Sequence, residues 1–229
     1  MKKIGIIGAM ELEVEELKSQ MEEVCVKEKA SMEFYQGTLN GKEVVVVRSG
    51  IGKVNAAVCT QILVDDFQAE AVINTGIAGS LKAEINIGDI VVSTDALQHD
   101  MDAREFGYPK GQIPQMNVFS FKADETLRKV AAECCKKANP DIQVFEGRVV
   151  SGDQFVASSE VKDELIREFA GSCTEMEGAA IAQAAYLNHV PFVAISDKAD
   201  NSATMDYPTF EKAAARHCAN LVKEMVKAL

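Results

Sequence analysis

Two carboxylates flank a methionine at the point where a run of small residues begins. The segment 174–182 reads TEMEGAAIA. Its alanines predict a helix that starts just after Glu177, which would place Glu175 and Glu177 beside unpaired N–H groups and the positive end of a helix dipole, where both can stay ionised. Paired carboxylates around a thioether suit the hydroxyls and the apolar face of a sugar. A solvated acidic helix start is the simpler interpretation of this pair alone. Only other features of the chain can favour a sugar-binding site.

Other carboxylates and glycine-rich turns follow the expected strands. Glu13 comes one helical turn after the strand 3–8, and Asp197 and Asp200 follow an apolar run that begins at Val190. Side chains at the carboxyl ends of strands share one edge of a sheet. No metal-ligand cluster, nucleophile–base pair or phosphate cradle accompanies them, so we expect neither metal nor cofactor. The pattern favours acid/base chemistry on a neutral, polyhydroxylated substrate, with glycosidic bond cleavage as the natural reaction.

The hydrophobic pattern predicts alternating strands and helices. The Asn40-Gly41 pair predicts a hairpin, and an irregular segment from His99 to Gln115 is typical of a functional loop or an interface. We therefore expect an α/β fold, a three-layer sandwich with a central mixed β-sheet flanked by helices, in one domain of residues 1–229. Expected strands are 3–8, 32–39, 43–49, 71–74 (with a glycine-rich turn at 75–80), 88–93, 144–150 and 190–197, and expected helices are 11–17, 54–65, 123–138, 158–169 and 208–229.

Composition excludes several classes of protein. The formal net charge is −11 without a Lys/Arg cluster, which disfavours nucleic-acid binding because a basic face must meet the phosphates. No apolar run reaches membrane-spanning length, and the start of the chain lacks the apolar region of a signal peptide, so we expect a cytoplasmic protein without membrane contact. The six cysteines form no Cys-x-x-Cys pair and only three histidines are present, which predicts neither a zinc site nor a disulfide framework.

Six motifs together resemble one known family over nearly the whole chain. The 5′-methylthioadenosine/S-adenosylhomocysteine nucleosidases carry similar motifs in the same order. The resemblance implies a nucleoside phosphorylase-type fold, a homodimer, and hydrolysis of an adenine nucleoside to adenine and a 5-thioribose. The motifs are GIIGAMELE (5–13), SGIGKV (49–54), NTGIAG (74–79), VSGD (150–153), EME (175–177) and AISDKAD (194–200).

The resemblance also implies a role for each matching residue. Asp197 would be the acid at N7 of the purine, and Glu13 would orient and deprotonate the attacking water. Glu177 would bind the ribose hydroxyls, supported by Glu175, with Met176 beneath the sugar. The remaining expected substrate contacts are Phe155 stacked on adenine, the backbone of Val156 at its edge, Ala78 and Gly79 in the second glycine-rich segment, Met10, Ile51 and Tyr207 around the 5′-thioalkyl group, and Phe106 and Pro114 from a partner subunit.

The sequence departs from the family pattern at two places. Ile77 stands where the family often has serine. In addition, Val193 runs directly into Ala194, where the family usually has three more residues that include an arginine. Three residues of strand correspond to about 10 Å, and an odd number reverses the face on which later side chains point. An ungapped alignment places Asp200, rather than Asp197, at the position of the acid.

Three rival interpretations remain at this stage. A purine or uridine phosphorylase shares the fold, but a carboxylate at Glu13 would repel the phosphate that such enzymes bind, and Arg48 is better explained as a surface residue at a strand end. A nucleoside-binding relative with impaired turnover would fit the shortened strand. Hydrolysis of aminofutalosine is the third possibility.

Overall fold

The computed structural model describes residues 1–199 and 207–229, and the side chains of 1–198 and 215–229. Helices and strands alternate along most of the described chain. The helices are α1 (Glu11–Ser19), α2 (Lys53–Asp65), α3 (Glu125–Ala138), α4 (Ser159–Phe169), α5 (Gly178–Leu187) and α6 (Tyr207–Ala228), with a 3-10 turn at Arg104–Phe106. The strands are β1 (Lys3–Gly8), β2 (Glu22–Lys29), β3 (Met32–Leu39), β4 (Lys42–Arg48), β5 (Ala71–Ser80), β6 (Ile90–Gln98), β7 (Phe121–Lys122), β8 (Val144–Ser151), β9 (Cys173–Glu175) and β10 (Phe192–Ala199).

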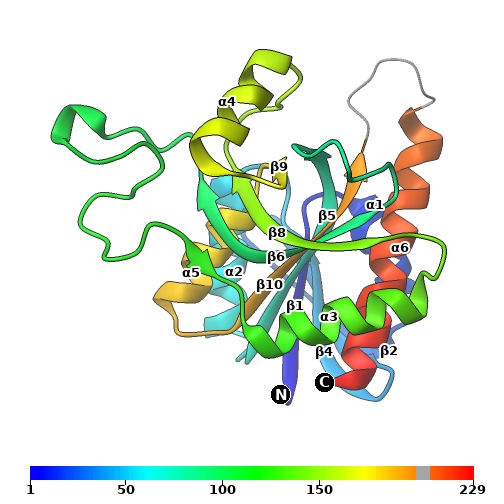
Figure 1. Ribbon diagram of the computed structural model, residues 1–229. Coiled ribbons are helices and arrows are strands. Elements are labelled where there is room, and N and C mark those ends of the chain that lie inside the picture. Colours follow the sequence, from blue (N-terminus) through cyan, green and yellow to red (C-terminus); the bar gives the residue numbers. More distant parts are fainter. Residues whose placement is uncertain (200–206) are drawn as a thin grey trace.

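The helices cover a mixed sheet from both sides (Figure 1). Helices α2 and α5 pack against each other on one face, whereas α1 and α3 both pack against α6 on the other. The core between these layers consists mainly of fully buried aliphatic residues of β1, β4, β5 and β10, which explains why these strands read as continuous apolar runs. The predicted three-layer α/β sandwich is therefore confirmed.

The sheet has two parts that share β5. On one side of β5 the strands follow the order β1-β4-β3-β2, and β2 forms an exposed edge. On the other side β9, β8, β6 and β10 follow, and β10 pairs with β5 again, so these strands close into a ring. Strand β1 runs parallel to both β4 and β5, and β10 runs parallel to β5. Their carboxyl ends consequently meet at one edge of the sheet, the place where ligands bind in open α/β sheets.

Most of the expected elements form, with two informative corrections. The hairpin between β3 and β4 turns at Asn40 (φ 51°) and Gly41 (φ 75°), both in the left-handed region that such a turn requires. The glycine-rich segment 75–80 is not a turn, because β5 continues through it to Ser80. Strand β2 was not predicted, since all its residues are exposed and it has no apolar face to mark it.

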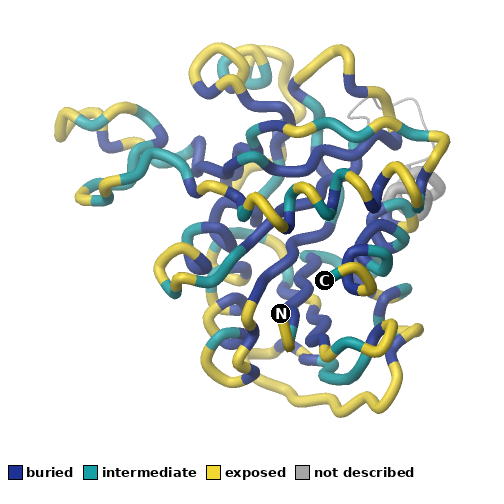
Figure 2. Tube along the Cα trace, turned by 60° about the horizontal axis from the view of Figure 1, so that its bottom comes forward, coloured by how far each residue is buried: buried dark blue, intermediate teal, exposed yellow. Residues whose placement is uncertain are grey.

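The connection from β6 to β7 projects from the body of the molecule (Figures 1 and 2). It contains the irregular segment that the sequence predicted, and only the short turn Arg104–Phe106 interrupts it. The Phe106 side chain is 83% exposed. Within the described residues, no helix is both long enough and apolar enough to cross a membrane.

Candidate active site

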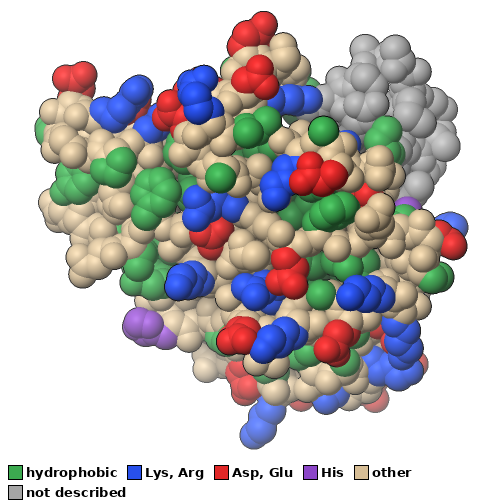
Figure 3. Space-filling model, viewed as in Figure 1, with side chains coloured by type: hydrophobic (Ala, Val, Ile, Leu, Met, Phe, Trp, Pro, Cys, Tyr) green, Lys and Arg blue, Asp and Glu red, His purple; other side chains and the backbone are tan. Residues whose placement is uncertain are grey.

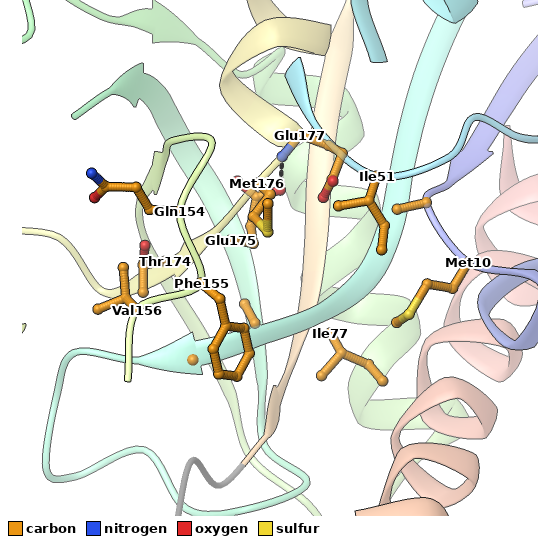
Figure 4. A pocket seen from close by; sticks show the side chains of 13 residues that line it. Met10, Ile51, Ile77, Gln154, Phe155, Val156, Thr174, Glu175, Met176 and Glu177 are labelled. Atoms are coloured by element: carbon orange, nitrogen blue, oxygen red, sulfur yellow. Dashed lines mark hydrogen bonds between the residues drawn. The ribbon is translucent and has the colours of Figure 1, made fainter. Parts of the chain in front are cut away.

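A pocket of about 200 Å³ lies at the carboxyl edge of the sheet (Figure 4). Its walls come from segments far apart in the sequence: the turn after β1, the loop before α2, the end of β5, the loop after β8, and the passage from β9 into α5. Apolar side chains form most of the surface and carboxylates face one part of it. The lining residues are Ala9, Met10, Ile51, Ile77, Ala78, Gly79, Gln154, Phe155, Val156, Thr174, Glu175, Met176 and Glu177.

The start of α5 positions the two carboxylates of the Glu-x-Glu pair. Glu175 Oε2 accepts hydrogen bonds from the backbone N–H groups of Glu177 (2.9 Å) and Gly178 (2.6 Å), and its other oxygen accepts one from the Ser151 hydroxyl. Glu177 Oε1 accepts the N–H of Gly52 at 2.6 Å. Glu175 therefore accepts unpaired N–H groups at the start of α5, as predicted for the pair, whereas Glu177 holds the loop before α2 against the pocket.

Burial has a larger effect on the pKa values of these two groups than the hydrogen bonds that they accept. Desolvation, followed by repulsion from Glu175, raises the pKa of Glu177 to about 8, although the Gly52 N–H opposes the shift. Desolvation also raises the pKa of Glu175, against the hydrogen bonds that it accepts. Burial of the two carboxylates side by side therefore disfavours the ionised form of both, contrary to the expectation from the helix start alone.

Glu13 is held in a recess next to the pocket, together with Glu175 and Glu177. Its Oε2 accepts the N–H groups of Ala9 (2.7 Å) and Met10 (2.9 Å), and its Oε1 accepts that of Ile77 (3.0 Å). Desolvation raises its pKa to about 7 despite these hydrogen bonds. A group with this pKa can accept a proton near neutral pH.

Gly76 explains how the carboxylate of Glu13 comes so near to β5. A Cβ at this position would lie 2.6 Å from Glu13 Oε1, so any other residue would push the carboxylate away. The glycine that the sequence suggested for a turn therefore serves close approach of a side chain to a strand.

Asp197 does not line the pocket, which corrects the expectation from the sequence. Its side chain is fully buried on the α6 side of the sheet, where Oδ2 lies 3.1 Å from Nδ1 of His217. Desolvation raises the pKa of Asp197 and the contact with His217 opposes this, while the same contact raises the pKa of His217. His217 is therefore a partly exposed residue that packs on Asp197 and lies outside the pocket lining.

The register of β10 gives the physical reason. Its pairing with β5 is unbroken from Phe192, opposite Val72, to Ala199, opposite Gly79, and Asp197 lies opposite Ile77. No bulge interrupts this pairing, so the side chains alternate between the two faces of the sheet. Ser196 lines the recess that holds Glu13, and Asp197 points to the α6 side. Asp200, the alternative candidate, lies outside the described residues.

The structure brings together most of the predicted site. Tyr207 begins α6, but its side chain is outside the described part of the chain. Phe106 and Pro114 lie in the projecting connection and not in this pocket. Sequence reasoning missed Ala9, Gln154 and Thr174, although each of them neighbours a residue of a motif. The predicted residues that line the pocket are Met10, Ile51, Ala78, Gly79, Phe155, Val156, Glu175, Met176 and Glu177.

Comparison with known proteins gives a consistent result. Residues 3–227 match the model of the phosphorylase superfamily. The 5′-methylthioadenosine/S-adenosylhomocysteine nucleosidase of Halalkalibacterium halodurans is 44% identical over 99% of this chain and 98% of its own length. A crystal structure of the Neisseria meningitidis nucleosidase in complex with methylthio-immucillin-A is 40% identical and superimposes with a TM-score of 0.95, covering both chains fully. The futalosine hydrolase of Helicobacter pylori is 34% identical with a TM-score of 0.91, over 100% of this chain and 98% of that one.

Proposed function

Because the chain belongs to the 5′-methylthioadenosine/S-adenosylhomocysteine nucleosidases of the phosphorylase superfamily, we propose that it hydrolyses the N-glycosidic bond of these two nucleosides. The products are adenine and the corresponding 5-thioribose. Adenine leaves with the help of an acid, and an activated water attacks the sugar. Phosphorolysis, the chemistry of other members of the superfamily, is the main alternative.

The charge of the pocket is the observation that favours hydrolysis. Three carboxylates, Glu13, Glu175 and Glu177, meet at the pocket and its recess. Among the described residues that line it there is neither lysine nor arginine. Arg48 is a surface side chain, 56% exposed and 3.8 Å from Glu11. A phosphate dianion would therefore meet carboxyl groups, which repel it as they ionise, and no counter-cation, whereas neutral water and ribose hydroxyls would meet hydrogen-bond acceptors.

Each pocket carboxylate suits a different part of the reaction. Glu13, whose pKa is about 7, is the base that orients and deprotonates water. Glu177 accepts from the ribose hydroxyls, since the Gly52 N–H occupies only its Oε1. Glu175 holds the start of α5 in place through its own hydrogen bonds. Met176 supports the apolar face of the sugar, and Phe155, whose ring is 70% exposed, covers the base.

The acid at the purine is assigned to the segment that follows β10. Asp197 was the first candidate, but its carboxylate is buried against His217 on the other side of the sheet. The next carboxylate along the chain is Asp200. We propose Asp200 as the acid, because an ungapped alignment with the family motif puts this residue at the position of the expected acid.

Product identity tests the proposed reaction. Methylthioadenosine is incubated with the protein in the presence of inorganic phosphate, and the sugar product is analysed by mass spectrometry. We expect free adenine and free 5-methylthioribose at a rate that phosphate does not change. Formation of the sugar 1-phosphate would contradict hydrolysis, and absence of adenine release would contradict the assignment as a whole.

A second substrate deserves a parallel assay. The likeness to a futalosine hydrolase is nearly as extensive as the likeness to the nucleosidases, at 34% against 40% identity for the two solved structures. The part of the pocket that would distinguish the substrates is its 5′ end, around Met10, Ile51 and Ile77. Competition between methylthioadenosine and aminofutalosine in one reaction measures the preference directly.

We also propose that the protein is a homodimer whose projecting connection completes the partner's pocket. Hydrophobic side chains gather on this connection (Figure 3), and Phe106 is almost fully exposed. On the α2–α5 face, Val54 (74%) and Leu187 (59%) are exposed as well. Apolar surface of this kind favours association. The solution mass, measured by light scattering, should be twice 24.8 kDa.

A further inference from the structure

Two loops that form walls of the pocket meet the start of the projecting connection in a closed ring of hydrogen bonds. Lys53 Nζ donates to Asp100 Oδ1 (2.6 Å), the backbone N–H of Asp153 donates to Asp100 Oδ2 (2.9 Å), and the backbone N–H of Lys53 donates to Asp153 Oδ1 (2.9 Å). Lys53 begins α2, Asp100 follows β6, and Asp153 follows β8. We refer to Lys53, Asp100 and Asp153 as the Asp100 ring.

The ring replaces an N-cap that α2 lacks. The N-cap residue is Gly52, which has no side chain to accept the first N–H groups of the helix. The carboxylate of Asp153 does so from another loop, at the positive end of the helix dipole. Gly52 has a φ of 98°, and a Cβ there would lie 3.1 Å from Asp153 Oδ1. The loop before α2 is therefore in direct contact with the loop after β8.

Asp100 is the member that holds the other two together. Both of its oxygens accept hydrogen bonds within the ring, and the side chains of Lys53 and Asp100 are only 18% and 19% exposed. Burial alone would raise the pKa of Asp100, but the hydrogen bonds from Lys53 and from the Asp153 N–H bring it below its usual value. The carboxylate is thus ionised at neutral pH, and a partly buried ion pair of this geometry holds its neighbours more firmly than a surface pair does.

Both loops continue directly into the pocket. Gly52, next to Lys53, donates its N–H to Glu177 at 2.6 Å. Phe155 and Val156, just beyond Asp153, line the pocket on the side assigned to adenine. A displacement of the ring would therefore reach the sugar and the base at the same time.

We propose that Asp100 is a positioning residue for the substrate pocket, acting through Lys53 on Gly52 and Glu177 and through Asp153 on Phe155. This inference rests on the proposed function. Because Asp100 contacts neither the sugar nor the base, its effect on binding should be the same for the substrate and for the transition state. Loss of such uniform binding raises KM and leaves kcat largely unchanged.

Asp100→Asn tests the proposal with little change in shape. An asparagine presents one acceptor and one N–H₂ group, so one of its two partners, the Lys53 ammonium or the Asp153 N–H, would face a donor. We expect KM for methylthioadenosine to rise by about tenfold, the effect of losing one charge-assisted hydrogen bond, with kcat within about twofold. Asp66→Asn is the matched control, because Asp66 is the C-cap residue at the far end of α2 and its carboxylate pairs with the exposed Lys29, and its KM should not change.

Hydrogen exchange of the free protein gives a second readout that requires no activity. In Asp100→Asn, amide exchange should accelerate both in residues 50–56 and in residues 152–156. In Asp66→Asn it should accelerate in neither segment. If wild-type protein releases no adenine, the proposed function fails, and the exchange data alone decide whether Asp100 organises the two loops. If wild-type protein is active, an unchanged KM in Asp100→Asn overturns the proposal, even if exchange accelerates. Unchanged exchange in both segments overturns it as well.

Discussion

Glu13→Gln is expected to lower the turnover of methylthioadenosine by about a hundredfold or more, as for other positioned acid/base groups. The amide cannot accept a proton from water. It would also turn an N–H₂ group towards the backbone donors of Ala9, Met10 or Ile77, all of which now bind the carboxylate. The measurement is the initial rate of adenine release at saturating substrate. Glu15→Gln is the matched control, since Glu15 lies on the same helix with its side chain exposed, and it should retain the wild-type rate.

The pH dependence of kcat/KM provides an independent test of the same residue. This parameter reports the free enzyme, in which the pKa of Glu13 is raised to about 7 and that of Glu177 to about 8. Only ionised carboxylates can take a proton from water or accept from both ribose hydroxyls. We therefore expect kcat/KM to rise with pH up to about 8, with apparent pKa values that belong to the coupled group rather than to one residue. A profile that is flat from pH 5.5 to 8 would contradict the role of Glu13.

The sequence predicted the layers of the fold and most of the site because both depend on local patterns. Apolar runs marked β1, β5 and β10, and Asn40-Gly41 marked a hairpin, since only residues tolerant of positive φ suit that turn. The carboxylates of Glu175 and Glu177 were assigned to a helix start, where the structure places them. These features are readable because each is decided within a few residues.

Features that depend on long-range pairing were not predictable in the same way. Gly76 suggested a turn, yet it lies within β5, and its function is to admit the carboxylate of Glu13 from another element. The raised pKa of Glu177 depends on burial beside Glu175, which a sequence motif does not contain. The Asp100 ring joins residues that lie 47 and 53 positions apart. Motif similarity likewise placed Asp197 at the purine, whereas the register of β10 places it elsewhere.

Asp200→Asn is expected to lower adenine release by about a hundredfold or more, whereas Asp197→Asn should keep most of it. Asp197 is fully buried against His217 and does not line the pocket, so we do not expect it to donate a proton to a purine there. Asp197→Asn should instead lower the melting temperature, since it removes the partner of His217 from a buried contact. Normal turnover of Asp200→Asn together with an inactive Asp197→Asn would show that the motif, and not the strand register, identifies the acid.

Lengthening β10 should exchange the roles of the two aspartates. Insertion of Val-Ile-Arg between Val193 and Ala194 moves Asp197 forward by three positions, about 10 Å along the strand, and reverses the face of its side chain. In this background we expect Asp197→Asn to become the inactivating change and Asp200→Asn to be tolerated. Stabilisation by adenine in a thermal shift assay verifies that each variant folds with an intact pocket. Because the same two substitutions are compared in both backgrounds, a general loss of activity cannot imitate the exchange. If Asp197 is required in both backgrounds, or Asp200 in both, the register of β10 does not select the acid and this explanation is wrong.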